Sequence, residues 1–146
     1  MKKVLFSAIL TVVIAASSFA ANVTNATTNA ARVFAIEFKG AENVSWTSSA
    51  DYVKASFTLD KKKMEAFYDL QGSLIATSSN ISLDDVPTSA KRSLAKKFAG
   101  YTVKEAIKFD GTDETAYYIS AENDTQSLIL KVSDTGFVSV FKQTKK

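Results

Sequence analysis

An internal repeat is the feature that most limits what this chain can fold into. Residues 31–40 read ARVFAIEFKG and residues 91–100 read KRSLAKKFAG, and four positions agree at a spacing of 60. Each segment ends in Phe-x-Gly, which is typical of a helix whose last turn packs an aromatic ring and whose C′ glycine has a positive φ. Apolar residues occur in both segments at helical spacing, namely Ala30, Phe34 and Phe38, then Ala90, Leu94 and Phe98. We therefore predict two equivalent amphipathic helices.

Strand-like segments follow each predicted helix. In residues 53–59, apolar side chains alternate with polar ones, the period-two pattern of a half-buried strand. Further segments of this kind are residues 64–70, 103–109, 116–121 and 127–133. Gly72 and Gly136 each lie in the last hairpin of their half. Each half therefore predicts a helix followed by three or four antiparallel strands.

A single unit of this kind buries little apolar surface, because about 60 residues are marginal for an independent core. Two units that share one sheet avoid this problem. We predict an α+β fold made of two tandem helix-plus-antiparallel-sheet repeats, residues 30–80 and 84–142, with both helices on one sheet face. The opposite face would be open. Residues 21–29 are small and polar, which predicts a flexible linker before a domain at 30–146.

The first twenty residues read as a signal peptide. A short basic start with two lysines precedes an uncharged apolar run, and Ser18 and Ala20 supply the small residues of a cleavage site. The apolar run is shorter than the roughly 20 residues that span a bilayer. No Cys follows the cleavage site, so we predict a soluble bacterial protein, periplasmic or secreted, without a membrane anchor after cleavage before Ala21.

Composition excludes several classes of chemistry. The 146 residues contain no His and no Cys, which excludes thiol nucleophiles, Ser-His-Asp triads, zinc fingers, and haem or iron–sulfur ligation. The chain has 18 basic and 15 acidic residues, and two of the lysines belong to the leader, so the processed chain is close to neutral. Nucleic acid binding needs a concentrated basic face, and we predict neither nucleic acid nor a cofactor as a partner.

Two short motifs have the spacing of known sites but lack the rest of those sites. Ser93 and Lys96 match the Ser-x-x-Lys of penicillin-recognising enzymes, but the Ser-Asp-Asn and Lys-Thr-Gly that complete that site do not occur. The acidic stretch at 110–114 is too short for a calcium loop and fits a hairpin turn. We therefore predict no catalytic residue and no metal site. Two carboxylates that converge in a cleft stay possible on sequence alone.

Strand parity also predicts which side chains point away from the helices. If Val53 and Phe57 face the helices, residues of opposite parity point to the open face. We predict a binding surface there, and its members are Tyr52, Lys54, Phe67, Tyr118, Ile129 and Lys131. Aromatic side chains are enriched at binding hot spots. A slip of one residue in register would exchange every assignment.

Four further stretches are informative together, namely 43–46 (NVSW), 52–57 (YVKASF), 63–72 (KMEAFYDLQG) and 96–101 (KKFAGY). They resemble the PepSY-like family, exported proteins of Bacteroidetes often called beta-lactamase-inhibitor-like. Val86 replaces the Leu that usually precedes the family's proline, and Asp60 stands where Gly is common. The resemblance implies tandem helix-plus-sheet repeats, as in beta-lactamase inhibitory protein, where the open sheet surface grips a partner protein. Similarity of fold does not identify a partner.

These observations together predict an exported, non-enzymatic binding module that recognises a protein or a peptide through an open antiparallel sheet face. One alternative is a binder of small molecules or envelope polymers, with Trp46 and the tyrosines as a stacking platform. A less favoured alternative is a hydrolase that depends on carboxylates.

Overall fold

The computed structural model describes residues 20–146. The predicted signal peptide lies outside the described residues, apart from Ala20. Two helices and eight strands follow one another in the order α1 (Ala20–Glu37), β1 (Glu42–Ser48), β2 (Val53–Leu59), β3 (Lys62–Tyr68), β4 (Leu74–Asn80), α2 (Thr88–Lys97), β5 (Thr102–Gly111), β6 (Thr115–Glu122), β7 (Gln126–Ser133) and β8 (Val138–Lys145). A short 3-10 helix, η1 (Leu83–Asp85), precedes α2. Each half is thus a helix followed by four strands.

All eight strands form one antiparallel sheet in the order of the sequence. Strand β4 pairs with β5, from Ala76 opposite Gly111 to Asn80 opposite Ile107, although η1 and α2 lie between them in the chain. This pairing joins the two halves. The predicted α+β class with an antiparallel sheet is confirmed.

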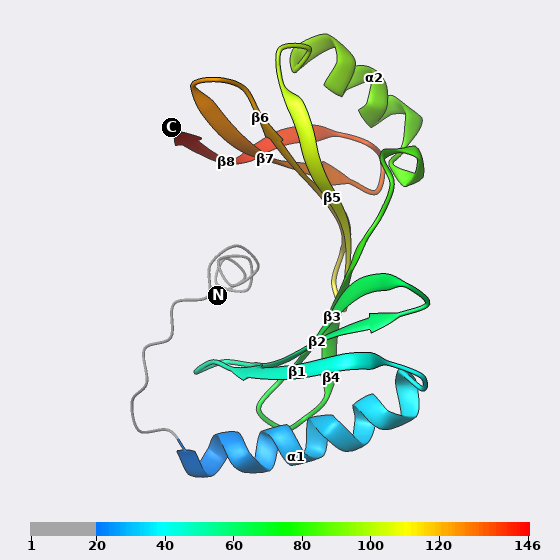
Figure 1. Ribbon diagram of the computed structural model, residues 1–146, viewed down its shortest axis with the longest axis vertical. Coiled ribbons are helices and arrows are strands. Elements are labelled where there is room, and N and C mark those ends of the chain that lie inside the picture. The colour runs from blue at the N-terminus through cyan, green and yellow to red at the C-terminus, as the bar shows by residue number, and fades with distance from the viewer. Residues whose placement is uncertain (1–19) are drawn as a thin grey trace.

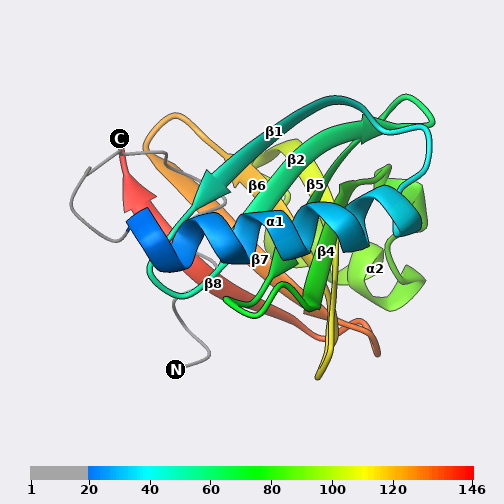
Figure 2. The same cartoon turned by 90° about the horizontal axis from the view of Figure 1, so that it is seen from below.

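The sheet bends strongly, so that α1 and α2 lie at opposite ends of the long axis of the molecule (Figure 1). Helix α1 lies across the strands of the first half (Figure 2). Both helices cover the same face of the sheet. Residues directly opposite each other on neighbouring strands point to the same face, and a series of such pairs leads from the strands under α1 to those under α2. Ala66 under α1 is opposite Thr77, Thr77 is opposite Asp110, and Ala106 on the same side of β5 is opposite Ile119 under α2. The bend leaves the other face concave.

Helix α1 begins ten residues earlier than the sequence predicts. It includes residues 21–29, for which a flexible linker is predicted, and that segment is helical instead. The segment contains no Gly or Pro to interrupt a helix, and Asn29 and Ala30 pack closely against Gly72 in the last hairpin of the first half. At the helix ends, Gly40 has the predicted positive φ, whereas Gly100 does not.

Each helix encloses its own core cluster against the sheet. Under α1 the cluster is largely aromatic: the Phe34 ring lies 4.8 Å from that of Phe57 and 5.5 Å from that of Trp46. Under α2 the cluster is mainly aliphatic, and its most buried members include Ile119 and Leu130. The predicted parity of the helix-facing side chains is confirmed in both halves. Among the described residues, no helix is both long and apolar enough to span a membrane.

Candidate functional site

The six residues of the predicted binding surface come together on the concave face. Lys54 on β2 is opposite Phe67 on β3, and Tyr118 on β6 is opposite Lys131 on β7. Tyr52 packs against Phe67, with ring centroids 5.8 Å apart, and Ile129 packs against the same cluster. All six lie on the side opposite to Phe57 and Ile119, as parity predicts.

The structure does not leave most of these side chains exposed, and here the prediction of an open aromatic surface is wrong. Tyr52, Lys54, Phe67 and Tyr118 have exposed fractions of 5%, 6%, 1% and 4%. Ile129 and Lys131 are half-buried. The physical reason is curvature, because a flat sheet would spread these side chains apart whereas the bend brings them together. The apolar ones belong to a third core cluster on the concave face.

A row of aromatic rings follows the floor of the concave face across both halves. Centroid distances along the row are 6.4 Å from Phe67 to Phe109, 6.5 Å from Phe109 to Tyr118 and 5.4 Å from Tyr118 to Phe141. The sequence prediction omitted Phe109 and Phe141. Phe109 could have been found from the hairpin at 110–115, because it faces Ala116, which shares the parity of Tyr118. Phe141 lies beside a register shift between β7 and β8, which alternation cannot anticipate.

Trp46 is not part of this row. Its ring lies 5.5 Å from Phe34 and 5.9 Å from Tyr68, so it belongs to the core under α1. The predicted stacking platform on Trp46 is therefore wrong. Trp46 is directly opposite Ala55 on the neighbouring strand, and both side chains therefore face α1.

Two lysines on the concave face share one arrangement, an ammonium placed between a carboxylate and an aromatic ring. Lys54 Nζ donates to Glu65 Oε1 at 2.7 Å and lies 5.9 Å from the Phe67 ring centroid. Lys131 Nζ donates to both oxygens of Glu114 at 2.8–2.9 Å and lies 6.0 Å from the Tyr118 ring centroid. A lysine can be buried as a cation only with partners of this kind.

The surroundings shift the titration of the two residues at the β6–β7 end of the face. Burial raises the pKa of Tyr118, although Lys131 opposes this effect. For Lys131, burial alone lowers the pKa, but the Glu114 carboxylate and Tyr118 outweigh it, so that the pKa is raised. Lys131 is therefore a cation at neutral pH, and its side chain is 30% exposed. Lys131 and Glu114 thus place an ion pair that is partly accessible to solvent at this end of the face.

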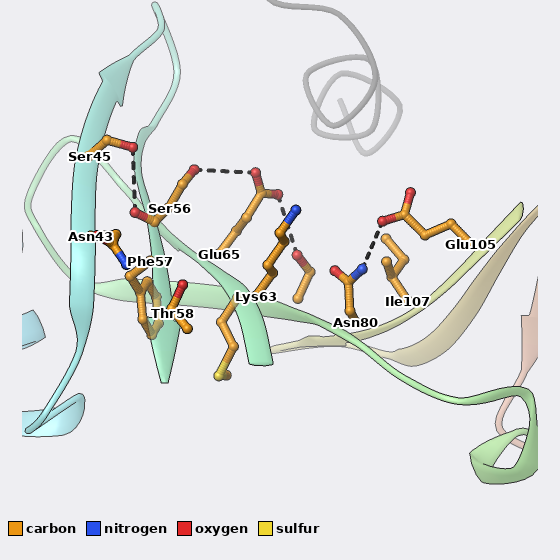
Figure 3. A pocket seen from close by; sticks show the side chains of 12 residues that line it. Asn43, Ser45, Ser56, Phe57, Thr58, Lys63, Glu65, Asn80, Glu105 and Ile107 are labelled. Carbon is orange, nitrogen blue, oxygen red and sulfur yellow. Dashed lines mark hydrogen bonds between the residues drawn. The ribbon is translucent and has the colours of Figure 1, made fainter. Parts of the chain in front are cut away.

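A polar recess of about 350 Å³ opens beside the aromatic row, over β1 to β5 (Figure 3). Four side chains line up across the strands here, since Ser45 is opposite Ser56, Ser56 opposite Glu65, and Glu65 opposite Ser78. Ser56 and Ser78 each donate to a different oxygen of Glu65 at 3.4 Å. Together with Lys54, these hydroxyls hold the Glu65 carboxylate as the centre of the recess.

The rim of the recess is polar and more exposed. Asn80 Nδ2 donates to Glu105 Oε1 at 2.8 Å on one side, as Figure 3 shows. Ser45, Lys63 and Glu105 are exposed. The recess therefore offers hydroxyl, amide, ammonium and carboxylate groups to a ligand. The sequence prediction missed it, although Ser56, Glu65 and Ser78 share the parity of Lys54 and Phe67.

Comparisons with known proteins place the fold. No family model and no curated protein matches this chain in sequence. Solved structures do match: a BLIP-like protein of Bacteroides fragilis NCTC 9343 has 13% identity and a TM-score of 0.65 over 81% of this chain and 84% of that chain. A DUF2874 family protein of Bacteroides uniformis ATCC 8492 has 13% identity and a TM-score of 0.70 over 80% and 87% of the two chains.

A candidate periplasmic protein of Bacteroides eggerthii DSM 20697 has 13% identity and a TM-score of 0.71 over 80% of this chain and 86% of that chain. This chain has the fold of these proteins. At such identities the likeness establishes the fold alone. The PepSY-like name stays a resemblance, since no family model matches.

Proposed function

We propose that this protein is an exported, non-enzymatic binding module that recognises a protein or a peptide through the concave face of its sheet. The observation that carries the proposal is the juxtaposition of an aromatic row with a polar recess on one curved surface. Protein interfaces combine an apolar centre with a polar rim in this way. The BLIP-like fold of the Bacteroides fragilis structure supports the same function.

In this proposal the buried residues of the concave face maintain its shape and do not contact the partner. Tyr52 packs against Phe67, and Phe109 links Phe67 to Tyr118, so that these rings together fix the curvature. Contact with a partner falls to the more accessible groups, which are Lys131, Phe141 and the rim of the recess. Lys131 is 30% exposed along its side chain and Phe141 is 44% exposed.

The arrangement of the carboxylates supports binding rather than catalysis. Glu65 accepts hydrogen bonds from Lys54, Ser56 and Ser78, which hold its carboxylate in one position. Glu105 is exposed and engaged by Asn80. A hydrolase with two carboxylates usually keeps its acid in an apolar, buried environment. Glu65 is ion-paired with Lys54 and Glu105 is exposed, so neither lies in such an environment.

Export to the periplasm is part of the proposal. The predicted signal peptide supports it, and so does the fold shared with the candidate periplasmic protein of Bacteroides eggerthii. The predicted absence of a nucleic acid partner rests on the nearly neutral charge of the processed chain.

The recess also favours a second candidate, a binder of small molecules or envelope polymers. Its volume of about 350 Å³ is within the range of ligand pockets, about 300–1,000 Å³. Its serines, asparagines and carboxylates match the hydroxyl groups of a saccharide. In this case the aromatic row would support the recess rather than contact a partner.

A capture experiment with matched variants tests the proposal. Ser45→Trp places a bulky ring at the exposed mouth of the recess, and Lys131→Glu reverses the charge at the other end of the face. Ala35→Trp on the exposed side of α1 and Lys97→Glu on α2 are the matched controls. Each purified protein is immobilised, exposed to periplasmic extract, and the retained proteins are quantified by mass spectrometry, with stability measured in parallel by urea denaturation.

We expect the wild type and both controls to retain the same protein. Both face variants should retain less than a tenth as much, with free energies of unfolding within about 1 kcal/mol of the wild type. Stable face variants that capture as well as the wild type would contradict binding through the concave face. Retention of a saccharide on a glycan array, lost in Ser45→Trp and without any captured protein, would favour the second candidate.

A further inference from the structure

A second cavity, of about 440 Å³, lies on the opposite side of the sheet, between α2 and the strands of the second half. Its lining is mostly apolar and includes Leu94 from α2, Phe98 directly after this helix, and Val103, Ala121 and Leu130 from the sheet. The volume lies within the range of ligand pockets, about 300–1,000 Å³. Figure 1 shows α2 at the end of the molecule far from α1. This cavity is separate from the concave face.

The cavity exists because large aromatic side chains of the first half have small counterparts in the second. The hairpins of the two halves can be matched by their register. Ala55 is opposite Ala66 in the first half, and Ile119 is opposite Leu130 in the second. The two pairs correspond, because Ala66 and Leu130 each lie six positions before the glycine of the last turn in their half. By this match, Phe57 corresponds to Ala121. Ile119 and Leu130, which stand where the first half has Ala55 and Ala66, fill only part of the space that the missing ring leaves.

One further exchange enlarges the space. On the helices, Phe34 corresponds to Leu94, at the spacing of 60 between the two segments. Phe34 is buried, whereas Leu94 is only half-buried. The space that the first half fills with rings is therefore open in the second.

Helix α2 cannot close this space by moving onto the sheet, because its first turn is already in contact. Gly136, with a φ of +88°, packs against Ser89 and Ala90, and a Cβ at Gly136 would lie 3.3 Å from the Ala90 amide nitrogen. Ala90 is fully buried, but the later residues of the same stripe, Leu94 and Phe98, are half-buried. The helix is therefore fixed at its beginning and held off the sheet towards its end.

The mouth of the cavity has one basic and one acidic side chain, Lys91 and Asp84. Lys91 lines it, and its Nζ donates to the backbone oxygen of Asp84 at 3.1 Å, which holds the ammonium there. Helix α2 carries four basic side chains and no acidic one. Asp84 is exposed to solvent, whereas Lys91 is half-buried. An apolar interior with a fixed ammonium at its mouth complements a ligand with an apolar chain and an anionic head.

We propose that this cavity binds a single-chain fatty acid, with its hydrocarbon chain between α2 and the sheet and its carboxylate near Lys91. Burial of the chain removes apolar surface from water on both sides, while the lysine gives a charge-assisted contact to the head. This proposal is independent of the function assigned to the concave face.

Calorimetric titration of the purified protein with monomeric octanoate, decanoate and decanol tests it. We expect one saturable site for each chain, and about tenfold tighter binding of decanoate than of octanoate, because two further CH₂ groups are buried. Lys91→Gln should weaken decanoate binding at least threefold and leave decanol binding unchanged. Lys97→Gln, a change of the same kind on α2 away from the cavity lining, should alter neither.

Filling the cavity gives the second arm of the test. Ala121→Phe introduces the side chain that the first half has at Phe57 and should reduce decanoate binding more than tenfold. Leu94→Phe, which copies Phe34, is a second filling variant in case the first fails to fold, and Ala35→Phe on the exposed side of α1 is the control. No saturable decanoate binding to the wild type, or full binding to a folded filling variant, would overturn the proposal. Binding to anionic vesicles without binding of monomeric decanoate would overturn it in favour of a membrane surface.

Discussion

The two halves of the molecule share one frame and differ in what fills it. Each has a helix over four antiparallel strands, and in each a glycine of positive φ in the last hairpin contacts the first part of the helix stripe. The first half fills the space between helix and sheet with aromatic rings, whereas the second has aliphatic side chains and a cavity of about 440 Å³. Strand register and the contact between helix and glycine thus set the arrangement of the backbone, and the core side chains can vary without changing it.

The concave face shows the same contrast in its charged groups. Lys54 in the first half has a side chain that is 8% exposed, whereas that of Lys131 in the second is 30% exposed. Both pair with a carboxylate beside an aromatic ring. The first pair therefore serves mainly to hold the fold together, and the second remains accessible to a partner.

The largest difference in stability between the two halves is expected when a helix side chain that faces the sheet is truncated. Phe34→Ala removes a buried ring from an aromatic cluster and should lower the free energy of unfolding by about 3–5 kcal/mol. Leu94→Ala removes a half-buried side chain that already borders a cavity, and should cost only about 1–2 kcal/mol. Urea denaturation of both variants gives the comparison. Equal losses would mean that the second half is packed as tightly as the first.

Replacement of the turn glycines by alanine should give a smaller difference in stability between the two halves. A Cβ at Gly72 would meet the side chain of Asn29 and lie 2.8 Å from the Ala30 amide nitrogen, so Gly72→Ala should cost about 3 kcal/mol. At Gly136 the nearest atom is the Ser89 hydroxyl oxygen, which can rotate away, and we expect about 1–2 kcal/mol. Thermal unfolding of the two variants measures this difference. A greater loss at Gly136 would contradict the expectation that the Ser89 hydroxyl can rotate away.

Much of this frame could be predicted from the sequence. Alternation in β2, β3, β6 and β7 identified which side chains face the helices, and the Phe-x-Gly segments located the ends of both. Exposure could not be predicted, because the burial of Tyr52 or Tyr118 depends on how the whole sheet bends, which no local pattern encodes. The polar recess was missed for a related reason, since Ser56, Glu65 and Ser78 form a site only through the pairing of separate strands.

Neutralising the two lysines should give a smaller contrast. Lys54→Gln leaves Glu65 without its cation in a mostly buried site and should cost about 2 kcal/mol, reduced from the value for a fully buried pair because Glu65 is 23% exposed. Lys131→Gln should cost less than about 1 kcal/mol, as for an exposed pair. Urea denaturation at neutral pH checks both. A larger loss for Lys131 would reverse the roles assigned to the two ion pairs.

The smallest expected effect at neutral pH concerns Tyr68, which has Val132 as its counterpart in the second half. Burial raises the pKa of Tyr68, and the Glu37 carboxylate adds to the effect. Tyrosine in the unfolded chain ionises near pH 10, below the pKa in the folded protein. The resulting stability is present below about pH 10 and is lost as the pH rises through the folded-state pKa.

Tyr68→Phe removes this dependence. Because the Tyr68 hydroxyl is buried and has no hydrogen-bond partner among the described residues, the variant should unfold within about 1 kcal/mol of the wild type at pH 7. Above pH 10 the variant should gain on the wild type by about 1 kcal/mol per pH unit, as followed by urea denaturation at several pH values. Parallel pH profiles of the two proteins would show that Tyr68 ionises freely.

Hydrogen–deuterium exchange, with and without decanoate, tests the contrast between the two halves most directly. The first half is filled and the second has room for a ligand, so we expect the amides of α2 to exchange faster than those of α1 from residue 30 onward. Decanoate should slow exchange in α2 and in β5 to β7 and leave α1 and β1 to β4 unchanged. Equal protection of the two helices, with no change in α2 at saturating decanoate, would contradict the account.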